Sequence, residues 1–215
     1  MIRGFSGNDS EGISRRAAIA AAVAIAAASV VRPAIARTGE VRVTLKTALG
    51  IIVVAVDPVR APITAGDFLA YVDRGLFDNA AFYRSVRLNN DHNPVKIEVL
   101  QGGLIDNAKM LPPIAHEPTS LTGLRHRNGT LSAGRREPGT GSAGAFFICI
   151  GDQPELDYGG HRNPDGQGFA AFGHVISGMD VVRQIWLSKT GPADEAMSTQ
   201  MLTPPVPILT AKRAR

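Results

Sequence analysis

Three glycines near the middle of the chain have the spacing of a phosphate-binding loop. The run Gly139-Thr-Gly141-Ser-Ala-Gly144 matches the G-x-G-x-x-G pattern of dinucleotide sites. That pattern holds a pyrophosphate only where the glycines follow a strand and open a helix, whose N-terminal amides bind the anion. Here the glycines lead into Phe146-Phe147-Ile148, an apolar run without a helical period. The spacing therefore does not predict a nucleotide site.

Histidine and cysteine are the next candidates for chemistry. The five histidines show no H-E-x-x-H or equivalent spacing, so we expect no metal and no cofactor. Cys149 is the single cysteine, which excludes an internal disulfide. Its neighbours are apolar, and no cation or helix start that would favour a thiolate lies nearby in the sequence. We therefore expect Cys149 to be buried and unreactive.

The stretch after the glycines predicts a strand that is apolar on both faces. Along Ala145–Ile150, residues 146, 148 and 150 fall on one side and residues 145, 147 and 149 on the other. A strand of this kind is covered on both faces. We expect it to be central, with its outer face under a helix or lining a pocket.

Short strands joined by turns dominate the rest of the chain. One helix is predicted to start near Pro62, with Thr64 as N-cap and Asp67 as its capping-box partner, and a second to follow an N-cap at Ser177. Residues 193–203 are predicted to be a mobile tail. The other predicted strands are 41–46, 50–56, 81–88, 95–100, 130–132, 169–175 and 206–211. Two helices set far apart favour an antiparallel barrel or sandwich capped by helices over a parallel α/β fold.

Residues 1–36 have the pattern of a secretory signal peptide. Arg15 and Arg16 precede fifteen uncharged residues, 17–31, and Ala34-Ile35-Ala36 matches a cleavage site. The paired arginines indicate the twin-arginine export route of bacteria. A membrane anchor needs about 20 apolar residues, so we expect no stable anchor. The sequence thus predicts a periplasmic or secreted domain at 37–215.

The charge of that domain argues against nucleic-acid binding. The full chain of 215 residues has a net charge of +4, and residues 37–215 contain 19 basic and 17 acidic residues, a net charge of +2. The small basic clusters have no aromatic stacking platform beside them. The length suits one domain with a single core, and we expect a monomer that binds no nucleic acid.

Several segments, taken in order, resemble the cyclophilins, a family of β-barrel peptidyl-prolyl cis-trans isomerases. The resemblance covers nearly all of the chain after residue 36. The segments are Ala61–Phe68, Phe82-Tyr83-Arg84, Gln101-Gly102-Gly103, Gly129–Ser132, Phe146-Phe147-Ile148, Leu156-Asp157 and Phe172–Asp180. The fold that the resemblance implies is mainly β: a closed eight-stranded antiparallel β-barrel capped by two α-helices.

The resemblance also implies a site and a reaction, the isomerisation of X-Pro bonds in proline-containing polypeptides. Rotation about such a bond crosses a barrier of roughly 18–20 kcal/mol. Arg84 would be the catalytic residue, because a fixed cation that donates toward the prolyl nitrogen localises its lone pair. The implied substrate-binding residues are Gln101, Phe147, Leu156, Phe169, Phe82, Gly134 and Arg135.

The sequence departs from the family pattern at several of these places. Ala145 replaces a glutamine, Phe169 a frequent histidine, and Glu98 and Glu155 replace aromatic residues, while the link from Arg84 to Gln101 is longer than usual. Either glutamate is expected to pair with Arg84 and compete for its donors. Two functions therefore stay open: an isomerase for the folding of exported proteins, or a catalytically weak module that binds proline-containing segments. Without the resemblance, Arg84 is better explained as a solvated strand residue, and Phe147 and Phe169 as core residues.

Overall fold

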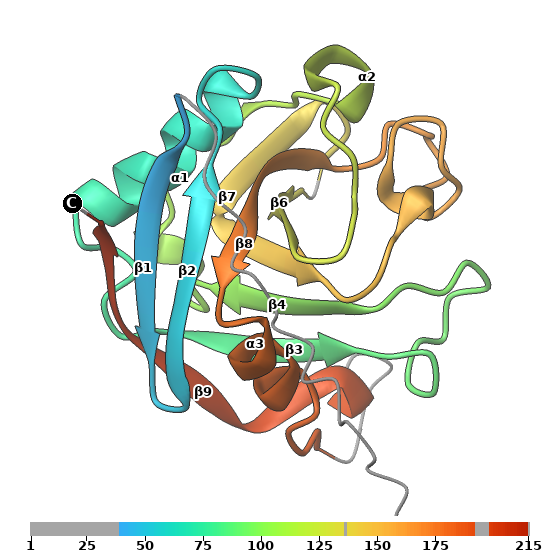
Figure 1. Ribbon diagram of the computed structural model, residues 1–215. Helices are drawn as coiled ribbons and strands as arrows, with labels where there is room; N and C mark the ends of the chain where they lie inside the picture. The colour runs from blue at the N-terminus through green and yellow to red at the C-terminus, as the bar shows by residue number, and fades with distance from the viewer. Residues whose placement is uncertain (1–38, 136, 192–197, 215) are drawn as a thin grey trace, which may run out of the picture. The chain divides into compact units, whose positions relative to one another are not determined.

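The computed structural model describes residues 39–135, 137–191 and 198–214, so the predicted signal peptide lies outside the described residues. In these ranges eight antiparallel strands form a closed ring in the order β4-β3-β9-β1-β2-β8-β6-β7, which pairing between β4 and β7 completes (Figure 1). The strands are β1 (Val41–Thr47), β2 (Gly50–Val56), β3 (Ala80–Val86), β4 (Val99–Gly103), β6 (Thr130–Gly134), β7 (Thr140–Cys149), β8 (Ala170–Ser177) and β9 (Met201–Arg213). The predicted closed barrel is therefore confirmed.

Helices and short elements cover the barrel. Helix α1 (Pro62–Asp73) packs against β7, β8 and β9, and α3 (Met179–Trp186) packs against β2, β3 and β4. The short elements in the described ranges are η1 (Asn107–Lys109), β5 (Ile114–Ala115), α2 (Thr119–Thr122), η2 (Pro154–Leu156) and η3 (Ser198–Gln200). The region 105–127, whose sequence resembles a plain loop, contains three of them.

The barrel interior is filled by alternate residues of the strands and by one face of α1. Phe68 of α1 reaches into an aromatic group with Phe146 of β7 at 5.5 Å, Phe77 at 5.2 Å and Phe172 of β8 at 5.1 Å between ring centroids. These side chains are fully buried. We call this set, with the strand residues packed around it, the interior cluster. Alternation along each strand places every second side chain inside a closed barrel, which explains the pattern.

The predicted helix caps are wrong in both helices. Helix α1 begins at Pro62, with Ala61 at the N-cap, and α3 follows Gly178 in a left-handed conformation. Proline fits the first position of a helix because its missing N–H needs no partner there. The amide of Thr64 instead donates to the Glu117 carboxylate at 2.5 Å, and Asp67 accepts from the amide of Ala143 at 2.9 Å. Both carboxylates therefore serve contacts distant in sequence.

The C-terminal strand is longer than predicted. Residues 198–203 form η3 and the start of β9 instead of a mobile tail, while residues 192–197 lie outside the described residues. Along β9, Val206 pairs with Phe82 and Met201 with Arg84, so the register shifts between these pairs. Pro204 and Pro205 lie in that irregular stretch. A bulge tolerates residues that have no N–H to donate, which is why the prolines do not end the strand.

Candidate functional site

The pairing of strands β3, β4 and β7 places three of the predicted site residues in one row across the barrel wall. Arg84 of β3 pairs with Gln101 of β4, Gln101 pairs with Phe147 of β7, and Phe147 pairs with Ser132 of β6. Paired residues of neighbouring strands point to the same face, and the strands lie about 4.8 Å apart. The row therefore brings a cation, an amide and an aromatic ring together, although 63 positions separate Arg84 from Phe147.

The Arg84 guanidinium is held by two amide oxygens. Its Nη1 donates to Oε1 of Gln101 at 3.0 Å, and its Nε and Nη2 donate to Oε1 of Gln200 at 2.9 and 2.6 Å. Burial lowers the pKa of Arg84 from its usual value, and the nearby charge of Arg162 acts in the same direction. An arginine stays protonated despite such a shift. The site therefore contains a partly desolvated cation with fixed orientation.

A second apolar cluster lies beside this cation, on the outer face of β7. It contains Val86, Ile97, Val99, Phe147, Cys149 and Leu156, with Phe169 packed against it, and we call it the outer cluster. The rings of Phe147 and Phe169 meet edge to face, with centroids 5.3 Å apart. Phe147, Leu156 and Phe169, all predicted to bind substrate, are thus brought together, and Phe169 is the one that keeps appreciable exposed surface.

The segment between Leu156 and Phe169 is folded tightly enough to bring its two ends into contact. The amide of Phe169 donates to the carbonyl oxygen of Leu156 at 2.9 Å. Gly168, between them, has φ +62°, and a Cβ there would lie 2.5 Å from the backbone of residues 156 and 157. A glycine is required at this position because both the dihedral angle and the close approach exclude a side chain.

A buried polar chain supports Phe147 from behind. His126 stacks on the Phe147 ring at 6.0 Å with an interplanar angle of 16°. Its Nδ1 lies 2.8 Å from Oδ1 of Asp157, and its Nε2 lies 2.9 Å from Oγ of Ser132. Because an ionised carboxylate only accepts, Nδ1 carries the proton and the Ser132 hydroxyl donates to Nε2. Ser132 is fully buried, so its hydroxyl cannot reach a substrate, although Ser132, His126 and Asp157 are joined in the order of a catalytic triad. We assign to these three residues the role of orienting the Phe147 ring.

Arg135 and Gly134 lie at the edge of the outer cluster. Arg135 makes a two-bond ion pair with Asp165, at 2.6 and 2.9 Å, and its Cζ lies 5.7 Å from the centre of the Phe169 ring. Its side chain is only 7% exposed. A Cβ on Gly134 would lie 2.9 Å from the carbonyl oxygen of Ala145. In this structure Arg135 therefore supports Phe169, and Gly134 allows β6 and β7 to approach closely.

Phe82, the remaining predicted substrate-binding residue, belongs to the barrel interior. Its side chain is fully buried in the interior cluster and meets Phe146 edge to face at 5.9 Å. On a regular strand residues 82 and 84 would share a face, but the register shifts between them, so that Phe82 pairs with Gly102 and Arg84 with Gln101. The Phe82 ring therefore points into the barrel, away from the face on which Arg84 and Gln101 are joined. We therefore assign Phe82 to the core and not to the substrate face.

The expected competition of glutamates for Arg84 is not observed. Among the described residues, Arg84 donates to Gln101 and Gln200 and to no carboxylate. Glu155 is occupied elsewhere, because its Oε2 accepts from the amide of His161 at 2.8 Å and lies 3.0 Å from His161 Nδ1. Glu98 is fixed through its backbone amide, which donates to Gln153 at 3.2 Å.

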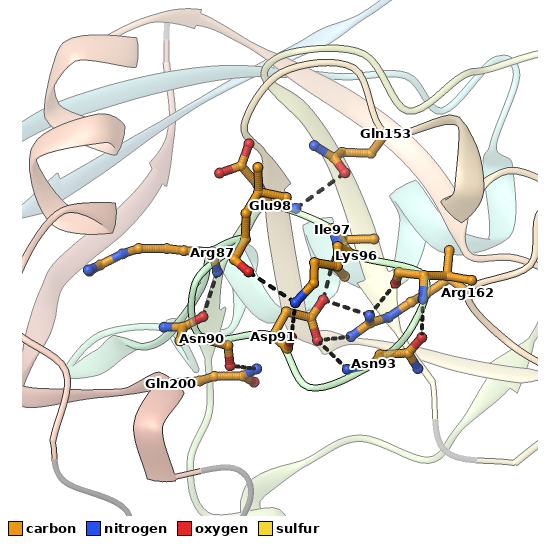
Figure 2. A network of polar contacts seen from close by, with 12 residues as sticks. Arg87, Asn90, Asp91, Asn93, Lys96, Ile97, Glu98, Gln153, Arg162 and Gln200 are labelled. Atoms are coloured by element: carbon orange, nitrogen blue, oxygen red, sulfur yellow. Dashed lines mark hydrogen bonds and ion pairs between the residues drawn. The ribbon is translucent and has the colours of Figure 1, made fainter.

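The long link between β3 and β4 is an ordered loop built around a buried ion pair (Figure 2). Asp91, which is almost fully buried, accepts from Nη1 of Arg162 at 2.7 Å and from the amide of Ile97 at 3.1 Å. Nη1 of Arg162 also donates to the Val95 carbonyl at 2.6 Å. Burial raises the pKa of Asp91, but the hydrogen bonds from Arg162 and the backbone outweigh it and lower the pKa overall. Because of this loop β4 starts at Val99, four residues later than predicted.

Cys149 lies in the outer cluster with its thiol fully buried, and burial raises its pKa far above the usual value. A thiol of this kind is a poor nucleophile. Within the ranges that the structure describes, no helix has the length and apolar character needed to cross a membrane. In the same ranges no group of three or more His, Cys, Asp or Glu residues is arranged to hold a metal ion.

Sequence reasoning missed Gln200, the chain from His126 to Asp157, and Arg162. Gln200 lies 116 positions from Arg84, and the others depend on contacts between loops. Their residue types alone carry no information about such partners. One available indication was the concentration of polar residues at 89–94, which marks a turn with many side-chain hydrogen bonds.

Comparisons with known proteins agree with this geometry. The family model described as cyclophilin type peptidyl-prolyl cis-trans isomerase/CLD matches residues 42–213. Peptidyl-prolyl cis-trans isomerase A of Dickeya dadantii (strain 3937) is 30% identical over 180 residues, which cover 81% of this chain and 87% of the relative. Peptidyl-prolyl cis-trans isomerase B of Escherichia coli (strain K12) is 32% identical over 156 residues, covering 69% and 86%.

Solved structures show the same fold. A crystal structure of a cyclophilin type peptidyl-prolyl cis-trans isomerase from Cryptosporidium parvum covers 82% of this chain and 98% of that chain, with a TM-score of 0.59 and 18% identity. A second structure of that protein, in the presence of the dipeptide Ala-Pro, gives a TM-score of 0.58. From the match over residues 42–213 and the identity to bacterial relatives, this chain belongs to the cyclophilin-type peptidyl-prolyl cis-trans isomerase family.

Proposed function

We propose that this chain catalyses cis-trans isomerisation of X-Pro bonds in exported polypeptides, with Arg84 as the catalytic residue. The reaction breaks no covalent bond and requires only that the twisted amide be stabilised against the planar one. In the twisted state the lone pair of the prolyl nitrogen is localised and accepts a hydrogen bond. A fixed guanidinium favours that state over the planar ground state.

The observation that carries this proposal is the row from Arg84 through Gln101 to Phe147. Two strand spacings, roughly 10 Å, separate the backbone of Arg84 from that of Phe147. An arginine side chain that reaches across this gap can approach the nitrogen of a proline whose ring lies against Phe147 and Phe169. Gln101 lies between them, where its amide can bind the peptide group before the proline.

The test is a protease-coupled assay on a short X-Pro peptide with the wild type and Arg84→Ala. We expect kcat/KM to fall by about 10²- to 10³-fold, the effect of removing one well-placed donor. Arg183→Ala, which removes an exposed arginine from α3, is the matched control and is expected to keep wild-type activity. No acceleration by the wild type would refute the isomerase assignment. Peptide binding without faster isomerisation would support the second candidate, a module that only binds proline-containing segments and has Ala145 where the family has a glutamine side chain.

Export is the other part of the proposal, and it is supported by the arginine pair and apolar stretch within residues 1–36. The substrates would then be proline-containing segments of proteins that fold outside the cytoplasm. Replacing Arg15 and Arg16 together by Lys is expected to block export by the twin-arginine route. The measurement is the distribution of the protein between cytoplasmic and periplasmic fractions. Normal export of the double variant would assign the general secretory route instead.

A further inference from the structure

We infer that Gln200 is a positioning residue for Arg84, an inference that rests on the proposed function. Its Oε1 accepts from both Nε and Nη2 of Arg84, at 2.9 and 2.6 Å, so one oxygen bridges the two donors on one edge of the guanidinium. Gln200 belongs to η3 and is only 3% exposed. Two hydrogen bonds to one acceptor fix both the distance and the tilt of the planar group.

The structure determines which end of the Gln200 amide faces Arg84. Nε2 of Gln200 donates to the carbonyl oxygen of Asn90 at 2.8 Å (Figure 2). This contact leaves Oε1 directed toward Arg84. Asn90 is itself held, because its Nδ2 donates to the carbonyl oxygens of Ser85 and Thr199. The amide of Arg87 donates to Oδ1 of Asn90 at 2.7 Å. Gln200 therefore links the loop after β3 to η3 and cannot flip without losing three hydrogen bonds.

This arrangement leaves part of the guanidinium available for a substrate. A guanidinium carries five N–H donors. Among the described residues, Gln200 takes two of them and Gln101 takes one. The two remaining donors, one on Nη1 and one on Nη2, have a fixed direction because the other three are occupied. Small errors in the position of a catalytic group cost large factors in rate, so this orientation matters for turnover.

The chemical type of the acceptor matters as much as its position. A glutamine oxygen is neutral, so Arg84 is oriented without an ion pair. A carboxylate at the same place would orient the guanidinium too, but it would offset the positive charge that stabilises the prolyl nitrogen. Glu98 and Glu155 do not supply such a carboxylate in this structure. Gln200 thus provides orientation and preserves the charge.

Two variants separate the two contributions of Gln200, the orientation of Arg84 and the preservation of its positive charge. Gln200→Met keeps the length and apolar stem but removes the acceptor, and we expect kcat to fall by about tenfold while the dissociation constant of the peptide changes less than twofold. Gln200→Glu restores an acceptor with a negative charge, and we expect kcat to fall at least as far. The control is Gln153→Met, which removes hydrogen bonds to Glu98 and Ile150 at another buried position and is expected to keep the wild-type kcat.

A spectroscopic measurement distinguishes positioning from general destabilisation. In the folded wild type the Arg84 Nε proton is hydrogen-bonded, and NMR should show slow exchange with solvent. We expect faster exchange in Gln200→Met and slow exchange in Gln153→Met. The inference is overturned if Gln200→Met keeps the wild-type kcat while Arg84→Ala loses activity. A wild type without isomerase activity, by contrast, would refute the proposed function itself.

Discussion

The two faces of β7 have nearly the same amino-acid character and different surroundings. Phe146 faces the interior cluster, where the rings of Phe68, Phe77 and Phe82 surround it. Phe147, one residue later, faces the outer cluster, where it meets Phe169 and is backed by His126. The interior cluster is sealed by α1 and contacts apolar groups, while the outer cluster is bordered by Arg84 and Gln101.

The difference shows how one strand can serve both stability and binding. In the interior, the aromatic neighbours of Phe146 belong to the same closed core, so its burial contributes to the free energy of folding. On the outer face, polar groups fixed by hydrogen bonds hold an apolar surface in place at the edge of the barrel. Of this cluster Phe169 keeps exposed surface, and under the proposed function a ligand would contact the cluster there.

The sharpest test of this comparison replaces each phenylalanine in turn. Phe146→Ala is expected to lower the free energy of unfolding by about 3–5 kcal/mol, the usual cost of a large cavity in a closed core. Phe147→Ala is expected to cost roughly 2 kcal/mol, because its smaller cluster opens toward solvent, and to weaken binding of an X-Pro peptide strongly. Denaturant unfolding and peptide titration measure the two effects.

Phe146→Leu and Phe147→Leu serve as controls, since both keep an apolar side chain and should lose less of either property. The comparison fails if Phe147→Ala destabilises the fold as much as Phe146→Ala and leaves peptide affinity unchanged in the folded fraction.

A second test uses pH, because the support of Phe147 includes a titratable group. Burial lowers the pKa of His126, against the opposing effect of its hydrogen bond to Asp157. The unfolded chain has a histidine pKa of about 6.5, so it binds more protons than the folded chain as pH falls through that value. We expect the free energy of unfolding to decrease by up to about 1.4 kcal/mol between pH 7.5 and 5.5.

Denaturant titrations at these two pH values provide the measurement. Asp91 and Asp157 are among the carboxylates whose pKa is lowered. Their contribution to the free energy of unfolding is lost only at pH values below this window, so it does not alter the comparison of the two pH values. Equal or greater stability at pH 5.5 would show that His126 is charged in the folded protein.

The third test concerns the outer cluster alone and has the smallest expected effect. Cys149→Ala removes a buried sulfur from the outer face of β7 and should lower stability by roughly 1 kcal/mol. Because the thiol is neutral and enclosed, isomerase activity should stay within a few-fold of the wild type. The measurements are the catalytic efficiency and a denaturation curve of the same Cys149→Ala sample. Lost activity in a folded variant would indicate a thiol function and a more specialised outer cluster.

The features predicted from sequence were those that one segment encodes by itself. The alternation of residues 145–150 indicated both faces of β7, since side-chain direction in a strand depends only on position. The glycines of 139–144 were predicted to lead into a strand and not a helix; the strand is present, but it begins at Thr140, so Gly141 and Gly144 lie within it. The order of family-like segments gave the closed barrel.

Features that depend on partners distant in sequence were not predictable from one segment. The N-terminus of α1 is satisfied by Glu117, 53 positions away from Thr64, and not by a local cap. Gln200 meets Arg84 only because η3 and the loop after β3 are brought together by β9. Nor does the sequence near Phe82 show that its ring lies inside the barrel. Local irregularity in β3 determines that direction.

The pairing of β4 with β7 has a consequence for a protein proposed to act among unfolded chains. An open sheet exposes a row of unpaired amides and carbonyls along its outermost strand, and an extended polypeptide can add to it as a further strand. In the described part of this chain, each strand of the eight-membered ring has a partner on both sides. Under the proposed function, client segments would therefore meet side chains such as Phe169 instead of unpaired backbone, which favours brief contact and release over aggregation.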